Sequence, residues 1–165
     1  MSDALRVLLV EDNRGDALLA KIALDEMQRV DADVRHVACL GDAIAALNGE
    51  PHDIVLLDLS LPDSHGIETV VRLRAETVDV PVIVLTGHDD EETAMRAMEA
   101  GAQDYIEKSR MDSRTLTRAI RYARERHRLL AELRHLVIID ELTGVYNRRG
   151  FVSMRQKEPS RMRVR

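Results

Sequence analysis

Several short apolar runs of the chain end in residues that can take part in metal or phosphate chemistry. These residues are, in chain order, Glu11, Asp12, Asp58, Thr86 and Lys108. Three carboxylates brought together repel one another unless a cation neutralises them, and an all-oxygen cluster suits a hard ion such as Mg²⁺. A lysine and a hydroxyl beside them would supply the positive charge and the hydrogen-bond donor that an incoming phosphoryl group needs. The residue types therefore indicate Mg²⁺-assisted phosphoryl chemistry, provided that the fold brings them together.

The elements that must position these residues alternate between strands and helices. Runs typical of strands cover residues 5–10, 34–40, 54–57, 80–85 and 104–106, and segments with helical spacing or caps lie between them. Short connections of this kind form right-handed crossovers, which produce a parallel sheet with helices on both faces. Functional groups in such a sheet gather at the carboxyl ends of the strands. The pattern predicts an α/β fold that places the candidate residues along one sheet edge.

The spacing of apolar residues also predicts which helix faces are buried. On the first helix we expect a buried face made of Ala17, Leu18, Ile22, Leu24 and Met27. On the fourth helix we expect one made of Ala94, Met95 and Met98. Ser113 is expected to cap a long final helix that reaches about Leu136.

The order and spacing of these residues resemble the receiver domain of bacterial response regulators over residues 4–125. The residues that carry the resemblance are the acid pair Glu11-Asp12, the phosphoacceptor position Asp58, Pro62 and Gly66 at the family's spacing after it, the switch positions Thr86 and Tyr105, and Lys108. Ser109 stands where the family often has a proline. The resemblance implies a flavodoxin-like, doubly wound, five-stranded parallel sheet of strand order 2-1-3-4-5 with an extended C-terminal helix.

The resemblance implies a metal site and a nucleophile. Mg²⁺ would be bound by Asp12, Asp58 and the backbone carbonyl of Ser60, with Glu11 holding the ion through water. Asp58 would attack a phosphohistidine on a sensor histidine kinase or a histidine phosphotransfer protein. The metal and Lys108 would stabilise the charge on the transferred group, so the implied catalytic set is Asp58, Thr86 and Lys108.

The resemblance also implies a conformational output. Thr86 would move toward the phosphoryl group, and Tyr105 would turn inward to fill the space that is vacated. The family's output is a population shift at the face of the fourth helix, fifth strand and fifth helix. We therefore expect a homodimer through this face and through the helix that continues beyond it.

The final helix is strongly basic. Residues 1–109 hold 9 Lys and Arg against 23 Asp and Glu, a net −14, whereas residues 110–165 hold 15 against 6, a net +9. An apolar stripe of Leu116, Ile120, Ala123, Leu130 and Leu133 runs along this helix. Residues 126–139 are expected to form a signalling linker helix whose leucines pair with the same helix of a second chain. Because the arginines lack interleaved aromatics and a second reading helix, nucleic-acid binding is not predicted.

The segment DELTGVYNRRGF, residues 140–151, resembles the opening motif of the GGDEF family of diguanylate cyclases. The matching residues are Asp140, Leu142, Thr143, Gly144, Asn147, Arg148 and Arg149, and in that family the asparagine helps to bind guanine. The glycine-rich acidic active-site loop does not follow in this chain. Residues 140–165 are therefore expected to be an incomplete, partly disordered stub without cyclase activity, and the parent protein a receiver-controlled diguanylate cyclase.

Two other functions stay open at this stage. One is a stand-alone protein-interaction module or pseudo-receiver. The other is a phosphatase of the haloacid dehalogenase type, which would need an acid where Ser60 stands. No window approaches the ~20 apolar residues of a membrane span, and the start of the chain lacks a signal-peptide layout. With one cysteine, Cys39, expected to be a small core residue, the sequence predicts a cytoplasmic protein without a membrane partner.

Overall fold

The computed structural model describes residues 4–77, 79–87 and 91–138. The main elements are β1 (Leu5–Val10), α1 (Arg14–Asp25), β2 (Ala32–Val37), α2 (Leu40–Gly49), β3 (Ile54–Asp58), α3 (Ile67–Glu76), β6 (Val82–Thr86), α4 (Glu91–Glu99), β7 (Asp104–Glu107) and α5 (Ser113–Ile138). Two-residue strands β4 (Ser60–Leu61) and β5 (Ser64–His65) and a 3₁₀ turn (Lys108–Arg110) complete them. The chain separates into two compact units, residues 1–127 and 128–165. The GGDEF-like motif at 140–151 lies outside the described residues.

The five main strands form one parallel sheet in the order β2-β1-β3-β6-β7. This is the predicted order 2-1-3-4-5 once the small β4–β5 hairpin is set aside, so the flavodoxin-like fold is confirmed. The register pairs Val10 with Leu57, Asp58 with Leu85, and Thr86 with Glu107. The carboxyl ends of β1, β3, β6 and β7 therefore lie along the same edge of the sheet.

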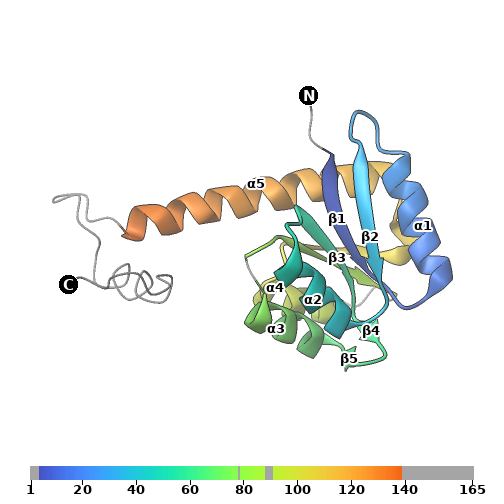
Figure 1. The fold of residues 1–165 in the computed structure, drawn as a ribbon, viewed down its shortest axis with the longest axis horizontal. Helices are drawn as coiled ribbons and strands as arrows, with labels where there is room; N and C mark the ends of the chain where they lie inside the picture. The colour runs from blue at the N-terminus through green and yellow to red at the C-terminus, as the bar shows by residue number, and fades with distance from the viewer. Residues whose placement is uncertain (1–3, 78, 88–90, 139–165) are drawn as a thin grey trace, which may run out of the picture. The chain divides into compact units, whose positions relative to one another are not determined.

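The sheet is buried on both faces because its strands are apolar without alternation. On β1, Leu5, Val7 and Leu9 pack with α1 and the first turns of α5. Leu8 and Val10 of the same strand pack with α2, α3 and α4 on the other face. Figure 1 shows α2, α3 and α4 grouped on one side of the sheet. The two cores hold the strand ends in a fixed frame around the candidate residues.

The buried face of α1 differs from the predicted one. Leu24 and Met27 are buried as expected, but Leu18 and Ile22 are 58% and 44% exposed. The helix instead packs through Ala17 and its alanine neighbours one turn apart, Ala20 and Ala23. Short side chains let the helix approach the sheet closely, whereas the spacing argument favoured the largest apolar residues. The prediction for this face was therefore wrong in part.

The predicted face of α4 was also wrong in part. Ala94 and Ala97 are buried, whereas Met95 and Met98 are 61% and 36% exposed. Cys39 is half-buried and not in the core. It is the N-cap of α2, and its Sγ accepts a 3.5 Å hydrogen bond from the backbone N–H of Asp42. Its role in the structure is local, since it satisfies an amide at a helix end.

The loop after β3 is held by a hairpin that the sequence did not reveal. Ser60 pairs with His65 across the antiparallel β4–β5 ladder. Between them, Asp63 accepts hydrogen bonds from the backbone N–H groups of Leu40 and Gly41, both at 2.9 Å. Asp63 thereby caps the start of α2 from a distant segment. The loop that follows Asp58 is thus attached to the neighbouring helix.

The apolar stripe of α5 changes character along the helix. Leu116, Ile120 and Ala123 are buried in the first unit. In the second unit the described side chains are mostly exposed, and the large apolar ones among them are Leu129, Leu130, Leu133 and Leu136. None of the helices in the described part of the chain is both long enough and apolar enough to span a membrane.

Candidate phosphoacceptor site

Three carboxylates meet where β1 and β3 end. Glu11 follows β1 directly and Asp58 is the last residue of β3. One carboxylate oxygen of each, together with one of Asp12, lies within 4.8 Å of the others. Glu11 and Asp58 are 1% and 4% exposed, whereas Asp12 is exposed. The structure therefore brings together the three acids that the sequence singled out, two of them inside the protein and one at its surface.

Lys108 reaches this cluster from the turn after β7. Its Nζ lies 2.7 Å from Oε2 of Glu11, 3.2 Å from Oδ1 of Asp58 and 2.9 Å from Oδ2 of Asp16. An ammonium group has three N–H donors, and here each has a carboxylate within reach. The lysine therefore offsets part of the negative charge that the acids bring together.

The backbone of Glu11 is fixed by β2. Its N–H donates to the carbonyl of Val37 at 3.0 Å, and its own carbonyl accepts a 2.7 Å hydrogen bond from Nε2 of His36. Its side chain accepts a 3.0 Å hydrogen bond at Oε1 from the backbone N–H of Asn13. Glu11 is thus held at both ends, and His36 supports the site from the neighbouring strand.

Burial and charge act in opposite directions on Glu11 and Lys108. Burial raises the pKa of Glu11 above its ordinary value, although the contact with Lys108 and the hydrogen bond from Asn13 act against the rise. For Lys108, burial disfavours the charged form, but the hydrogen bonds to Glu11 and Asp16 outweigh it. The nearby Asp58 adds to them, and the pKa of Lys108 lies above its usual range. The lysine is therefore a permanent cation of the site.

The remaining predicted residues lie around the cluster at different depths. Thr86 ends β6 next to Asp58 in the strand order and is 8% exposed. A Cβ added at Gly87, just beyond it, would meet no atom within 4 Å, so there is space on this side. Ser60 is exposed on β4, two residues after Asp58. Tyr105 lies on β7 and is 38% exposed.

The donor set fits a hard divalent cation. All the gathered ligand atoms are carboxylate oxygens, the type that Mg²⁺ prefers. Oε2 of Glu11 is buried, and among the described residues it has no hydrogen-bond partner beyond its 2.7 Å ion-pair contact with Lys108. A cation bound here would relieve the repulsion between Glu11 and Asp58 that contributes to the raised pKa of Glu11.

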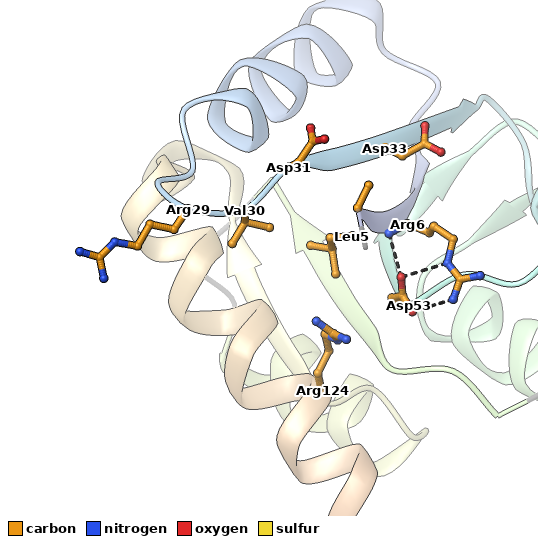
Figure 2. A pocket seen from close by; sticks show the side chains of 9 residues that line it. Leu5, Arg6, Arg29, Val30, Asp31, Asp33, Asp53 and Arg124 are labelled. Carbon is orange, nitrogen blue, oxygen red and sulfur yellow. Dashed lines mark hydrogen bonds and ion pairs between the residues drawn. The ribbon is translucent and has the colours of Figure 1, made fainter. Parts of the chain in front are cut away.

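The first unit also contains a cavity away from the cluster. A cavity of about 550 Å³ lies at the opposite, amino-terminal edge of the sheet (Figure 2). Within it Arg6 forms a two-pronged ion pair with Asp53, at 3.1 and 3.0 Å from its guanidinium nitrogens. Asp31 and Asp33 lie along its rim, and Arg124 of α5 points toward it. Among the described residues, the acids that lie close enough together to hold a metal ion are Glu11, Asp12 and Asp58, at the carboxyl edge.

Two buried acids, a paired lysine and a threonine thus lie at the carboxyl edge of a five-stranded parallel sheet. Comparison with known proteins gives the family. A model of the response regulator receiver domain matches residues 7–121, and the chain belongs to this family. Such domains accept a phosphoryl group from histidine kinases or phosphotransfer proteins and generally bind Mg²⁺ at an acidic pocket.

Two curated relatives illustrate the match. The regulatory protein LuxO of Vibrio cholerae is 35% identical over 98 residues, which is 59% of this chain and 21% of LuxO. The transcriptional regulatory protein TcrA of Mycobacterium tuberculosis is 38% identical over 107 residues, 63% of this chain and 40% of TcrA. The chain thus spans less than half the length of either relative.

Solved structures agree with the fold. A CheY-like receiver domain protein of Methanospirillum hungatei has a TM-score of 0.64 at 25% identity, covering 76% of this chain and 98% of that one. The phosphorylated cyanobacterial phytochrome response regulator RcpA has a TM-score of 0.57 at 27% identity, covering 74% and 90%.

Asp16 is the contact residue that sequence reasoning missed. It lies in the first turn of α1, and its backbone N–H donates to the side chain of the N-cap Asn13 at 3.0 Å. An acid in a first helical turn has an ordinary explanation in the helix dipole, which hid its second contact. The position of Asp16 in the sequence could have indicated this contact. Because α1 begins three residues after Glu11, its first turn must lie near the site.

Proposed function

We propose that Asp58 of this chain accepts a phosphoryl group from a phosphohistidine of a sensor kinase or phosphotransfer protein. The observation that supports this most strongly is the contact of Lys108 with both Asp58 and Glu11. An oxygen of Asp58 forms the new O–P bond while the N–P bond of the phosphohistidine breaks. The electron pair of that bond stays on the imidazole nitrogen of the donor.

The other residues take supporting roles in this proposal. Asp12, Asp58 and the backbone carbonyl of Ser60 would hold Mg²⁺, with Glu11 acting through water. The ion supplies positive charge that offsets the acids and the phosphoryl oxygens. Lys108 donates to a phosphoryl oxygen, and Thr86 donates to another.

We further propose that phosphorylation changes association of the chain in the cytoplasm. Tyr105 and Tyr122 line a cavity of about 290 Å³ on the β7–α5 face, and both are partly exposed. Inward movement of Tyr105 would reshape this surface. A homodimer through the α4, β7 and α5 face and the helix at 126–139 would pass the change to the output domain. On the resemblance of residues 140–151, that output is a diguanylate cyclase.

The test is intact-mass measurement after incubation with acetyl phosphate and Mg²⁺. The chain should gain the mass of one phosphoryl group, and Asp58→Asn should gain none. Asp63→Asn is the matched control, because it removes an acid from the same loop outside the carboxylate cluster. Labelling of Asp58→Asn at the wild-type level would refute the assignment.

Association is tested separately by sedimentation of the full chain with and without beryllofluoride, a phosphoryl mimic. A shift toward dimer with the mimic supports phosphorylation-controlled output. Phosphorylation without any shift would refute the dimer proposal and leave the phosphoacceptor assignment intact.

A further inference from the structure

We infer that Asp16 is a positioning residue that competes with the phosphoryl group for Lys108. The inference rests on the proposed function, because it concerns the state of the lysine before and after Asp58 is phosphorylated. Asp16 lies outside the set of acids that gather around the candidate metal site, yet its Oδ2 is 2.9 Å from Nζ of Lys108. Its contact with the site is therefore made through the lysine.

The position of Asp16 is set by a short chain of hydrogen bonds that starts in the site. The backbone N–H of Asn13 donates to Glu11, and the side chain of Asn13 accepts from the N–H groups of Gly15 and Asp16. The first turn of α1 is thereby fixed relative to the strand end. As a result, the carboxylate of Asp16 meets the ammonium of Lys108 from the side of the helix.

The three carboxylate contacts of Lys108 differ in what it would cost to release them. Glu11 is 1% exposed at its side chain, and within the described part of the chain its Oε2 contacts only Lys108 among polar groups. Asp58 is 5% exposed at its side chain and is the group that receives the phosphoryl. Asp16 is 35% exposed, so water can replace the lysine there. Releasing a buried acceptor carries a desolvation penalty that releasing a hydrated one avoids.

An arriving phosphoryl group requires an N–H of Lys108, and the ammonium already has three carboxylates within 3.2 Å. Asp16 is the contact that gives way at least cost, and its negative charge also repels the incoming dianion. The competition for Lys108 and the charge repulsion both disfavour the phosphorylated state. The phosphorylated state is therefore less favourable with an aspartate at position 16 than it would be with a neutral residue of the same shape.

The experiment measures beryllofluoride affinity of the full chain at saturating Mg²⁺ by titration calorimetry. Asp16→Asn keeps an acceptor for Lys108 but removes the charge, and we expect it to bind roughly twofold to fivefold more tightly than wild type, the upper part of the range for one partly exposed ion pair. Asp25→Asn makes the same charge change at the exposed far end of α1 and should match wild type. Asp16→Glu retains the charge and should bind more weakly than Asp16→Asn.

A second readout separates positioning from general stability. The ¹⁵N signal of the Lys108 ammonium should shift in Asp16→Asn before any mimic is added, and circular dichroism should show an unchanged fold. Suppose that wild type and Asp25→Asn bind beryllofluoride, but Asp16→Asn binds it no more tightly than wild type. That result would refute the positioning role of Asp16 and leave the phosphoacceptor assignment intact. Failure of wild type itself to bind the mimic overturns the proposed function and this role with it.

Discussion

Replacing Lys108 with methionine tests how far the acid cluster depends on one cation. The variant removes the ammonium that lies within 3.2 Å of Glu11, Asp16 and Asp58 while keeping a side chain of similar length. Glu11 would then hold a fully buried oxygen without a partner. Removing one member of a buried ion pair costs roughly 3–5 kcal/mol. Because Lys108 is 17% exposed and Asp16 can rehydrate, we expect about 3 kcal/mol, the low end of that range.

The loss should depend on pH in a defined direction. In the folded wild-type chain the pKa of Glu11 already lies above its ordinary 4.5, mainly through burial, and loss of Lys108 raises it further. A group with a raised folded-state pKa binds protons more tightly when folded, so stability falls as pH rises through that pKa. The destabilisation by Lys108→Met should therefore be small near pH 4.5 and grow toward pH 8. Added Mg²⁺ should stabilise the variant more than wild type, because it replaces the missing positive charge.

The assay is urea unfolding followed by far-ultraviolet circular dichroism at pH 5 and pH 8, with and without Mg²⁺. Lys21→Met is the matched control, since Lys21 contacts only His36, at 3.4 Å, among the contacts described. We expect it to change the free energy of unfolding by less than about 1 kcal/mol. A loss for Lys108→Met that is equal at both pH values, or no larger than that of the control, would refute the argument from a buried, neutralised cluster.

Three further substitutions test the frame around the site by thermal or urea unfolding. Leu116→Ala removes a fully buried side chain of α5 and should cost about 2–5 kcal/mol, whereas Leu136→Ala, 60% exposed on the same helix, should cost far less. Asp63→Ala removes the acceptor of the Leu40 and Gly41 N–H groups at the start of α2 and should cost about 1 kcal/mol, and Asp63→Asn should cost less. Gly101→Ala forces a side chain into φ +107°, with its Cβ 3.4 Å from Arg74, and should cost about 1 kcal/mol or more, unlike Gly87→Ala.

Each of these has a result that would contradict it. Equal losses for Leu116→Ala and Leu136→Ala would mean that burial does not distinguish the two parts of α5. The pKa of Asp63 is lowered because the two backbone N–H groups outweigh its burial, so its contribution should be lost as pH falls through that lowered pKa. A cap whose effect grows in acid would contradict this account. Tolerance of Gly101→Ala would mean that the turn adapts without strain.

The fold and the main site could be predicted because their signals are local. Uninterrupted apolar runs locate strands buried on both faces, and in a parallel sheet the residue after each run must lie at the carboxyl edge. Glu11, Asp58 and Thr86 follow directly from that geometry. The resemblance to receiver domains added the strand order, which periodicity alone does not determine.

The features that were missed depend on contacts between distant segments. The capping of α2 by Asp63 joins positions more than twenty residues apart, and the contact between Asp16 and Lys108 joins positions that are 92 residues apart. The predictions of which residues form the buried faces of α1 and α4 were wrong in part for another reason. Spacing allows more than one face, and hydrophobicity favours the longer side chains, whereas close approach to the sheet favours alanine.

The alanine face of α4 has a consequence for local stability. Among the described residues, α4 buries Ala94 and Ala97, whereas α3 buries Val70 and Leu73 and α2 buries two leucines. Apolar burial stabilises in proportion to area, and alanine is smaller than valine or leucine, so we expect α4 to be held more weakly than α2 and α3. Its amide protons should exchange with solvent through local openings of lower free energy than those of α2 and α3. The helix that follows Thr86 is therefore the one that the site can displace with the least work.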